Sequence, residues 1–286
     1  MTSELSPAAV QVLESGISSS PQVEHRLALL RKWKIPQGSK VLEIGCGQGD
    51  CTILLADLVG ENGHVTAIDP ASLDYGAPMT LGEAQSQLKA SPLGNRITFK
   101  QTTVEEFCQT NDEIYDCAVF ARCLWYLPSP DILLSMLRSL RGRVRRVLIA
   151  EFLLDLQGDI AVLPHMLAVI SLADINIGQP SDPWTSNDNV QSICSPKMIR
   201  EMGRETGWEL ETESIIEAAE GLEDGRWEVG HVLSESYAAR VESLTPEPRR
   251  VYAKMLLDAV KQSTATQPLA AVRALPTWFS SWKPSS

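Results

Sequence analysis

Three glycines at alternate positions follow an apolar run, and this segment has the clearest chemical potential in the chain. Residues 41–49 read V-L-E-I-G-C-G-Q-G, so Gly45, Gly47 and Gly49 come directly after residues typical of a buried strand. Glycine allows positive φ and carries no Cβ, so a ligand can lie directly against such a turn. The segment therefore predicts a cofactor-binding enzyme, with a tight turn that binds nothing as the alternative for the glycines alone.

The spacing of the glycines and one nearby acid distinguish two kinds of cofactor. The dinucleotide fingerprint is G-x-G-x-x-G, in which the pyrophosphate meets a helix N-terminus. Here the spacing is G-x-G-x-G, and Glu43 stands two residues before the first glycine. A carboxylate at that position would repel a pyrophosphate and attract a cationic amino-acid group. A dehydrogenase is therefore disfavoured.

A second acid closes the next strand pattern. Residues 63–69 read G-H-V-T-A-I-D, and Asp69 lies 20 residues after Gly49. In a βαβ unit, an acid at the tip of the second strand can accept hydrogen bonds from both ribose hydroxyls. The pair Asp69-Pro70 is also a good turn start. We favour ribose binding because the position, the strand and the acid agree.

Composition limits the class of protein and its partners. The chain has 286 residues with 44% hydrophobic content, and its mean hydropathy of −0.07 is typical of a soluble globular protein. The chain has neither an apolar run of the ~20 residues that span a bilayer nor an N-terminal signal-peptide pattern, so we expect a cytoplasmic protein without a membrane partner. The formal net charge of −11 disfavours nucleic-acid substrates. The arginines within 138–146 are interpreted as a solvated helix end.

The cysteine pattern gives no support for a metal site. The six cysteines form no C-x-x-C pair and have no histidine nearby at ligand spacing. We therefore predict no metal and expect the thiols to stay reduced.

Strand and helix patterns alternate along most of the chain. This alternation predicts an α/β fold with a doubly wound, mostly parallel seven-stranded sheet, whose binding residues lie at the C-terminal strand tips. The expected strands are 40–44, 64–68, 96–100, 116–120, 144–152, 208–216 and an antiparallel 275–282. The expected helices are 6–15, 21–34, one from the glycines to 59, 80–89, 129–142, 160–177, 196–206 and 246–262.

The chain shows no repeat and no clear second domain, so we expect one domain over 1–286. Its expected parts are N-terminal helices (1–35), a cofactor-binding core (36–156), a helical insertion or lid (157–197) and a C-terminal part of the sheet with acceptor-side helices (198–286). Extra helices are expected at the N-terminus and within 155–195 and 230–262.

From about 36 to 156 the order of motifs resembles the cofactor half of the class I S-adenosylmethionine-dependent methyltransferases. Glu43 and the three glycines match the first motif of that family, and Asp69 matches its ribose-binding acid. The resemblance implies a Rossmann-like methyltransferase fold, S-adenosylmethionine as cofactor and S-adenosylhomocysteine as product. It also implies that Cys46 and Pro70, within these two motifs, contact the cofactor.

The resemblance extends to the tips of the third and fourth strands. Thr103 occupies a position where many members have an adenine-binding Asp, and Val104 is placed to offer its backbone N–H and to pack on the ring. Ala121 and Arg122 correspond to the backbone that lines the methionine part of the cofactor. The threonine departs from the family pattern because its hydroxyl lacks the charge of an Asp.

Residues beyond the fourth and fifth strands are candidates for the acceptor side. Trp125 and Tyr126 could wall an aromatic or cationic pocket, although packing between helix and sheet explains them equally well. Glu151 stands at the tip of the fifth strand, where the resemblance implies that it approaches the acceptor.

Histidines are the candidates for a general base, if the acceptor must lose a proton. His165 lies in the segment expected to cover the site and is the best candidate, with an ordinary helical histidine as the alternative. His231 ranks second. His64, at the start of the second strand, is expected at the opposite edge of the sheet.

Three functional hypotheses remain. The first is a small-molecule methyltransferase with an N, O or S acceptor; residues 69–72, the long link to 80 and residues 275–278 look most like those of secondary metabolism. The second is a protein methyltransferase with an open acidic groove. The third is a protein of this fold that binds the cofactor without methyl transfer. We expect a monomer or a homodimer.

Overall fold

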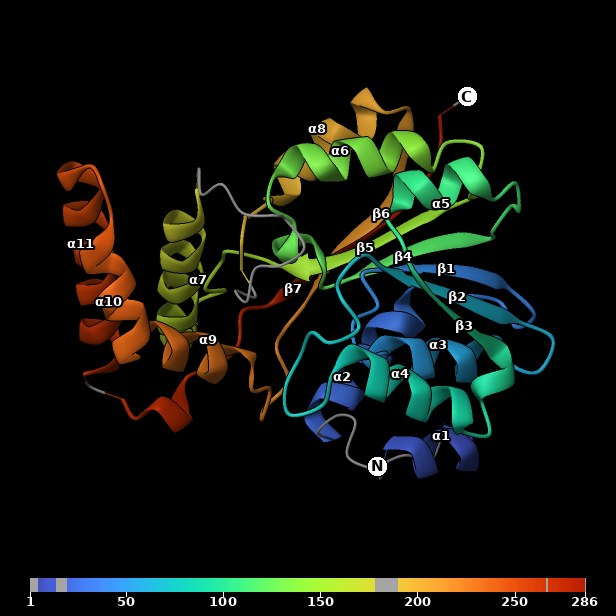
Figure 1. Cartoon of the computed structure of the whole chain (residues 1–286), viewed down its shortest axis with the longest axis horizontal. Helices are drawn as coiled ribbons and strands as arrows, with labels where there is room; N and C mark the ends of the chain where they lie inside the picture. Colours follow the sequence, from blue (N-terminus) through green and yellow to red (C-terminus); the bar gives the residue numbers. More distant parts are fainter. Residues whose placement is uncertain (1–4, 14–19, 178–189, 266, 286) are drawn as a thin grey trace.

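The computed structural model describes residues 5–13, 20–177, 190–265 and 267–285. One seven-stranded sheet organises them, in the order β3-β2-β1-β4-β5-β7-β6 (Figure 1). The strands are β1 (Lys40–Ile44), β2 (His64–Asp69), β3 (Ile97–Gln101), β4 (Cys117–Ala121), β5 (Val147–Phe152), β6 (Trp208–Ile216) and β7 (Thr277–Pro284). The first five strands pair in parallel, and β7 runs antiparallel to both of its neighbours. The predicted seven-stranded, mostly parallel sheet is therefore confirmed.

Helices cover both faces of the sheet. The helices are α1 (Pro7–Val12), α2 (Ser20–Lys32), α3 (Asp50–Val59), α4 (Leu81–Ala90), α5 (Val104–Thr110), α6 (Pro130–Ser139), α7 (Leu163–Asn176), α8 (Pro196–Glu205), α9 (Asp224–Val232), α10 (Glu235–Ser243) and α11 (Glu247–Thr264). In Figure 1, α1 to α4 lie below the sheet and α5, α6 and α8 lie above it. Two buried clusters separate accordingly: Val41 packs with the first group and Leu42 with the second. Successive residues of a strand point to opposite faces, so a strand covered on both faces needs apolar residues at neighbouring positions, as at Val41 and Leu42.

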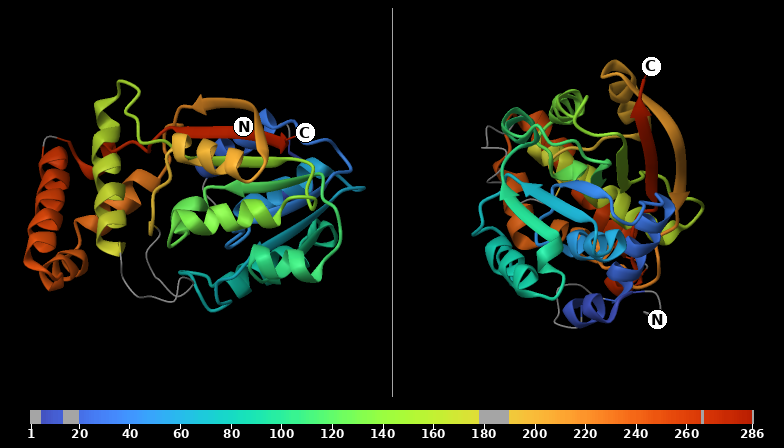
Figure 2. Two further views of the ribbon diagram at one scale, coloured as in Figure 1. Left: turned by 90° about the horizontal axis from the view of Figure 1, so that it is seen from above. Right: turned by 90° about the vertical axis from the view of Figure 1, so that its right-hand side faces the viewer.

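A group of helices stands beyond one edge of the sheet. Helix α7 packs against α9 and α11, and α10 packs against α11. Figure 2 shows α7 and α11 side by side and away from the strands. This group meets the sheet at the C-terminal ends of β4 and β5, because α7 and α9 contact residues there, as described below.

Several element boundaries differ from the sequence prediction, and the largest differences concern β5, α5 and α9. Strand β5 begins at Val147 instead of 144, because the preceding residues form a turn in which Val144 N donates to Leu140 O at 3.2 Å. Helix α5 was not predicted. Helix α9 begins at Asp224, ahead of the expected helical range 230–262. Residues 14–15 of the predicted first helix and 178–189 of the predicted insertion or lid (157–197) lie outside the described residues.

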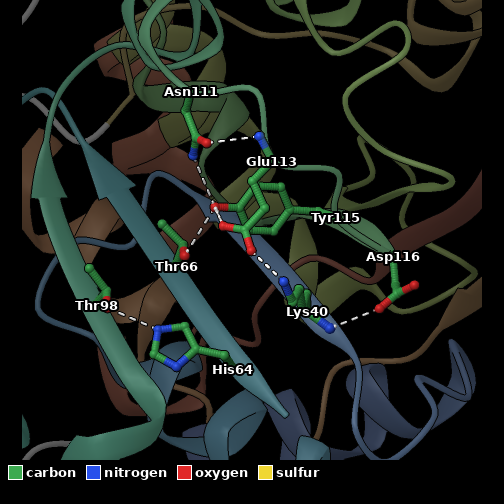
Figure 3. Close-up of polar contacts among 8 residues, drawn as sticks. All are labelled: Lys40, His64, Thr66, Thr98, Asn111, Glu113, Tyr115 and Asp116. Carbon is green, nitrogen blue, oxygen red and sulfur yellow. Dashed lines mark hydrogen bonds and ion pairs between the residues drawn. The ribbon is translucent and has the colours of Figure 1, made fainter.

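Polar side chains join the strands at the N-terminal edge of the sheet (Figure 3). Tyr115 donates its hydroxyl hydrogen to Thr66 Oγ1 at 3.3 Å, and Lys40 forms an ion pair with Glu113. His64 shares a hydrogen bond of 2.9 Å with Thr98. These bonds link β1, β2, β3 and the segment before β4. His64 is the first residue of β2, so the prediction that it lies at the N-terminal edge of the sheet, opposite the C-terminal strand tips, is confirmed.

Within the described residues, no helix combines the length and the apolar character needed to cross a bilayer. The same residues contain no group of side chains that could hold a metal ion. All six cysteines are free and buried.

Candidate active site

The glycine turn links β1 to α3 with a left-handed backbone. The φ angles are 69° at Gly45, 51° at Gly47 and 92° at Gly49, so all three lie where side chains are strained. A Cβ at Gly45 would come within 2.6 Å of Cys123 Cβ, and one at Gly49 within 2.3 Å of Leu88 Cδ1. A Cβ at Gly47 would meet nothing within 4 Å. Packing therefore requires a glycine at 45, a Cβ at 49 would have to displace the tip of the buried Leu88 side chain, and Gly47 leaves an open side where a ligand can lie.

Asp69 ends β2 directly beside this turn. Its Oδ2 accepts a hydrogen bond from Gly47 N and its Oδ1 accepts one from Ala71 N, both at 2.9 Å. Each carboxylate oxygen keeps a further lone pair, which a ribose hydroxyl can use. Burial raises the pKa of Asp69 although both backbone bonds oppose this. Gln85, which the sequence did not single out, supports the turn by donating from Nε2 to Gly47 O at 2.9 Å.

Glu43 lies beneath the glycine turn and is only 2% exposed. Its Oε2 accepts a hydrogen bond of 2.5 Å from Thr52 Oγ1 of α3. Burial raises the pKa of Glu43 to about 7. An approaching cation would favour the ionised form, so this carboxyl is suited to sense a positive ligand group. Burial also raises the pKa of the neighbouring Cys46 thiol well above its usual value, so this thiol stays neutral.

Thr103 and Val104 begin α5, the helix that the sequence analysis missed. Thr103 Oγ1 accepts from Glu106 N at 3.2 Å, while Glu106 Oε2 accepts from Thr103 N at 3.3 Å. This is a capping box, and its signature Thr-x-x-Glu is visible in the sequence. The helix bond leaves Thr103 with one oxygen lone pair and the hydroxyl hydrogen for a ligand. The Val104 side chain is 1% exposed and packs in the core. Its backbone N–H belongs to the first turn of α5, where the helix offers it no carbonyl partner.

Arg122 is expected to line the cofactor through its backbone, and its side chain extends instead towards α9. Ala121 ends β4, and Arg122 follows with φ of 58°. Its backbone N donates to Ala150 O at 2.8 Å. The guanidinium forms an ion pair of 3.1 Å with Asp224 of α9 and lies 4.0 Å from the centre of the Phe152 ring. Arg122 thus connects the tips of β4 and β5 to the separate helix group.

Glu151 positions the short helix η3 (Leu124–Tyr126) at the end of β4. Its Oε2 accepts from Leu124 N and its Oε1 from Phe152 N, both at 2.9 Å. The side chain is 2% exposed, and burial raises its pKa to about 7. Trp125 is 3% exposed, whereas Tyr126 is 44% exposed. The carboxyl of Glu151 is thus bonded to backbone groups on both oxygens and holds η3 in place.

His165 on α7 is fully buried, and its geometry argues against the predicted role as base. Nδ1 accepts a hydrogen bond of 2.9 Å from Leu275 N, so this nitrogen carries no proton. The neutral ring then bears its proton on Nε2, which is a donor. Burial lowers the pKa of His165 to about 4. His231 lies on the exposed side of α9, edge-on to the Tyr237 ring at 5.9 Å.

Two acids of α9 belong to this region and were missed in the sequence. Asp224 accepts from Gln22 Nε2 at 2.8 Å in addition to its ion pair with Arg122. Although burial acts in the opposite direction, the Arg122 guanidinium and the Gln22 bond lower the pKa of Asp224 to about 2. Glu228 lies one turn further along the same face, and burial followed by the charges of Asp224 and Glu151 raises its pKa to about 8. The available signal was a pair of acids at positions i and i+4 in 224–228.

The fold and the glycine turn together define a Rossmann-like enzyme that holds a small cofactor at the C-terminal edge of its sheet. A family model described as "Methyltransferase domain" matches residues 41–145. A solved structure of a cyclopropane-fatty-acyl-phospholipid synthase-like protein from Lactobacillus casei is 31% identical, with a TM-score of 0.79, and the match covers 92% of this chain and 90% of that chain. The chain belongs to the class I S-adenosylmethionine-dependent methyltransferases.

Curated relatives agree with this family. Methyltransferase phomM of Diaporthe leptostromiformis is 27% identical over 288 residues, which covers 85% of this chain and 73% of the relative. Ubiquinone biosynthesis O-methyltransferase of Aliivibrio fischeri is 32% identical over 109 residues, which covers 38% of this chain and 40% of the relative. The second similarity is thus confined to a limited part of both chains.

The residues at the glycine turn fit S-adenosylmethionine. The open side of Gly47 gives room for it, Asp69 offers free lone pairs to a ribose, and the buried Glu43 suits its ammonium group. When bound, this cofactor supplies a methyl group on a sulfonium sulfur and leaves as S-adenosylhomocysteine.

Proposed function

We propose that the enzyme methylates an N, O or S atom of a small-molecule acceptor. We further propose that this acceptor is a secondary metabolite, because residues 69–72 and 275–278 resemble those of methyltransferases of secondary metabolism. The observation that carries this proposal is the burial of the candidate acceptor-side residues. Trp125 is 3% exposed, Glu151 is 2% exposed and His165 is fully buried. These three candidate side chains are too deeply enclosed to meet the surface of a folded protein, whereas Tyr126, which is 44% exposed, lies where a small molecule can reach it.

The proposed cofactor contacts come from four strand tips. Glu43 and Asp69 bind the ammonium and the ribose, while the backbone of the glycine turn lies against the cofactor. The full proposed set is Glu43, Gly45, Cys46, Gly47, Gly49, Asp69, Pro70, Thr103, Val104, Ala121 and Arg122. Trp125 and Tyr126 face the acceptor in this proposal, and Glu151 acts through η3.

Methyl transfer to such an acceptor depends mainly on alignment. The nucleophile, the methyl carbon and the sulfur must lie in line, and proximity with orientation can lower a barrier by about 7–11 kcal/mol. The packed η3 segment and the buried carboxyl beneath it provide rigid positions for this purpose. A proton acceptor is needed only where the nucleophile must lose a proton.

A protein substrate is the second hypothesis, and the net charge of −11 would suit a basic peptide. The same buried side chains argue against it. The absence of nucleic-acid and membrane partners, a cytoplasmic location and a monomeric or homodimeric state stay predictions.

Two measurements test the proposal. Calorimetric titration with S-adenosylmethionine should show binding, and failure to bind at high micromolar concentration would contradict the assignment of the site. Incubation of metabolite extracts with cofactor labelled in the methyl group should then give a labelled small molecule. Label found only in protein would favour the second hypothesis.

A further inference from the structure

Three buried side chains surround the Phe152 ring, and each has a nitrogen without a partner. The ring centres of Trp125 and His165 lie 5.5 Å and 5.3 Å from that of Phe152, and the Arg122 guanidinium lies 4.0 Å from it. Within the described part of the chain, Trp125 Nε1, His165 Nε2 and Arg122 Nε are buried without a hydrogen-bond partner. Buried polar groups are nearly always bonded, so these atoms point to a ligand that the protein itself does not supply.

All three unpartnered nitrogens are donors. Indole Nε1 and guanidinium Nε always carry a hydrogen. His165 Nε2 carries one as well, because its Nδ1 accepts from Leu275 N. A ligand that satisfies these groups therefore has to offer an oxygen or another hydrogen-bond acceptor.

The charges around the three donors determine whether the ligand oxygen that they bind is neutral or anionic. The positive charge of Arg122 is already neutralised by Asp224 at 3.1 Å, in a pair that is 10% and 16% exposed. The groups that face Glu228 electrostatically are Asp224 of its own helix, Glu151 of β5 and Tyr126 of η3. No uncompensated cation is among them, so an anionic ligand would be repelled. A neutral carbonyl-type oxygen suits the donors best.

Glu228, in the same region, offers an acceptor in place of a donor. Its Oε2 is buried and has no partner among the described residues. The other candidates for a base are already engaged: Glu151 is bonded on both oxygens, and Asp224 is held as an anion by Arg122 and Gln22. Glu228 is therefore left as the carboxyl that, in its ionised form, can take up a proton.

Building on the function proposed above, we propose that Glu228 is the catalytic residue that accepts the proton of the methyl acceptor, and that Trp125 and His165 donate hydrogen bonds to an oxygen of the same molecule. The acceptor is then a neutral compound with an O–H or N–H nucleophile and a carbonyl-type oxygen. In the transfer, the bond from this O or N to the methyl carbon forms and the carbon–sulfur bond breaks. The electron pair of the broken bond stays on sulfur, and the proton of the nucleophile moves to Glu228.

Glu228→Gln tests the base directly, with Glu220→Gln as the matched control at an exposed position in the turn before α9. Carboxyl-labelled glutamate in NMR should show a resonance that titrates near pH 8 in the wild type and the control and is missing in Glu228→Gln. With the acceptor found in the extract screen, turnover of Glu228→Gln should fall by about 100-fold or more. The rise of turnover with pH should disappear, while S-adenosylmethionine still binds by calorimetry.

The outcomes separate the two proposals. If the wild type yields no labelled small molecule, the proposed function fails, whatever the carboxyl titration shows. If the wild type is active and Glu228→Gln equals the control at every pH, or if no resonance is lost in the variant, the role of Glu228 is refuted.

His165 variants test the donor role with a different readout. His165→Gln keeps an N–H donor, so it should retain the KM for the acceptor within a few-fold. His165→Leu removes the donor and should raise this KM by about 10-fold with the same pH profile. A pH profile that changes in His165→Gln would instead restore the histidine as the base.

Discussion

Replacing Glu228 by glutamine should change how the free energy of unfolding depends on pH. Burial and two nearby acids raise the pKa of Glu228 from 4.5 to about 8 in the folded protein. Between these values the folded state holds a proton that the unfolded chain releases. The free energy of unfolding of the wild type therefore falls as the pH rises through this window. Glutamine has no proton to release, so the variant lacks this contribution.

The difference between the two pKa values of Glu228 sets the size of the change in the free energy of unfolding. It spans about 3.5 pH units, and about 1.4 kcal/mol per unit gives an upper limit near 5 kcal/mol. Solvent reaches part of this half-buried side chain, so we expect about 2–4 kcal/mol. Glu43 and Glu151 also have raised pKa values, but both remain in the variant. The difference between the two proteins consequently isolates Glu228.

Urea unfolding at pH values from 5 to 9 measures this difference. Wild type and Glu228→Gln should have similar stability near pH 5, and the variant should be the more stable protein at pH 9. The control Glu220→Gln should follow the wild type throughout. Parallel curves for the wild type and Glu228→Gln would refute the claim that the structure keeps this carboxyl protonated near neutral pH.

Three further predictions concern the cofactor side. Asp69→Asn should weaken S-adenosylmethionine binding by about 10–100-fold in calorimetry, because it removes a charged hydrogen-bond acceptor. Wild-type affinity should rise with pH through about 7 as Glu43 ionises, and Glu43→Gln should abolish this dependence; an equal dependence in both would contradict the role of Glu43. Gly49→Ala should lower the free energy of unfolding by about 2–4 kcal/mol, because its Cβ would strike Leu88. Gly38→Ala, with φ of 81° and open space, should cost only about 1–2 kcal/mol in the same urea assay.

The cofactor-binding half could be predicted from the sequence because its motifs lie close together along the chain. The turn at 45–49, the strand before it and Asp69 after it lie within one βαβ unit, and the structure places Asp69 Oδ2 2.9 Å from Gly47 N. The mostly parallel sheet also follows from the alternation of strands and helices, because parallel strands need crossover connections; the order of the strands was not predicted. Helix α5 carried the same kind of local signal in Thr103 and Glu106.

The acceptor half could not be predicted in the same way because its contacts join distant segments. Arg122 meets Asp224 across 102 positions, and His165 accepts from Leu275 across 110. No periodicity reports such pairs. Their partners depend on how α7 and α9 pack beyond the end of the sheet, which is a tertiary property.

His165 shows why the identity of a residue alone misjudges its chemistry. A histidine near an active site suggests a base, since its usual pKa lies near neutrality. One backbone N–H, that of Leu275, turns the ring into a donor by occupying Nδ1, and full burial holds it neutral. Burial, followed by the charges of Asp224 and Glu151, raises the pKa of Glu228, which the sequence did not single out. The environment thus reverses the roles that the side-chain types suggest: the imidazole donates and the carboxyl accepts.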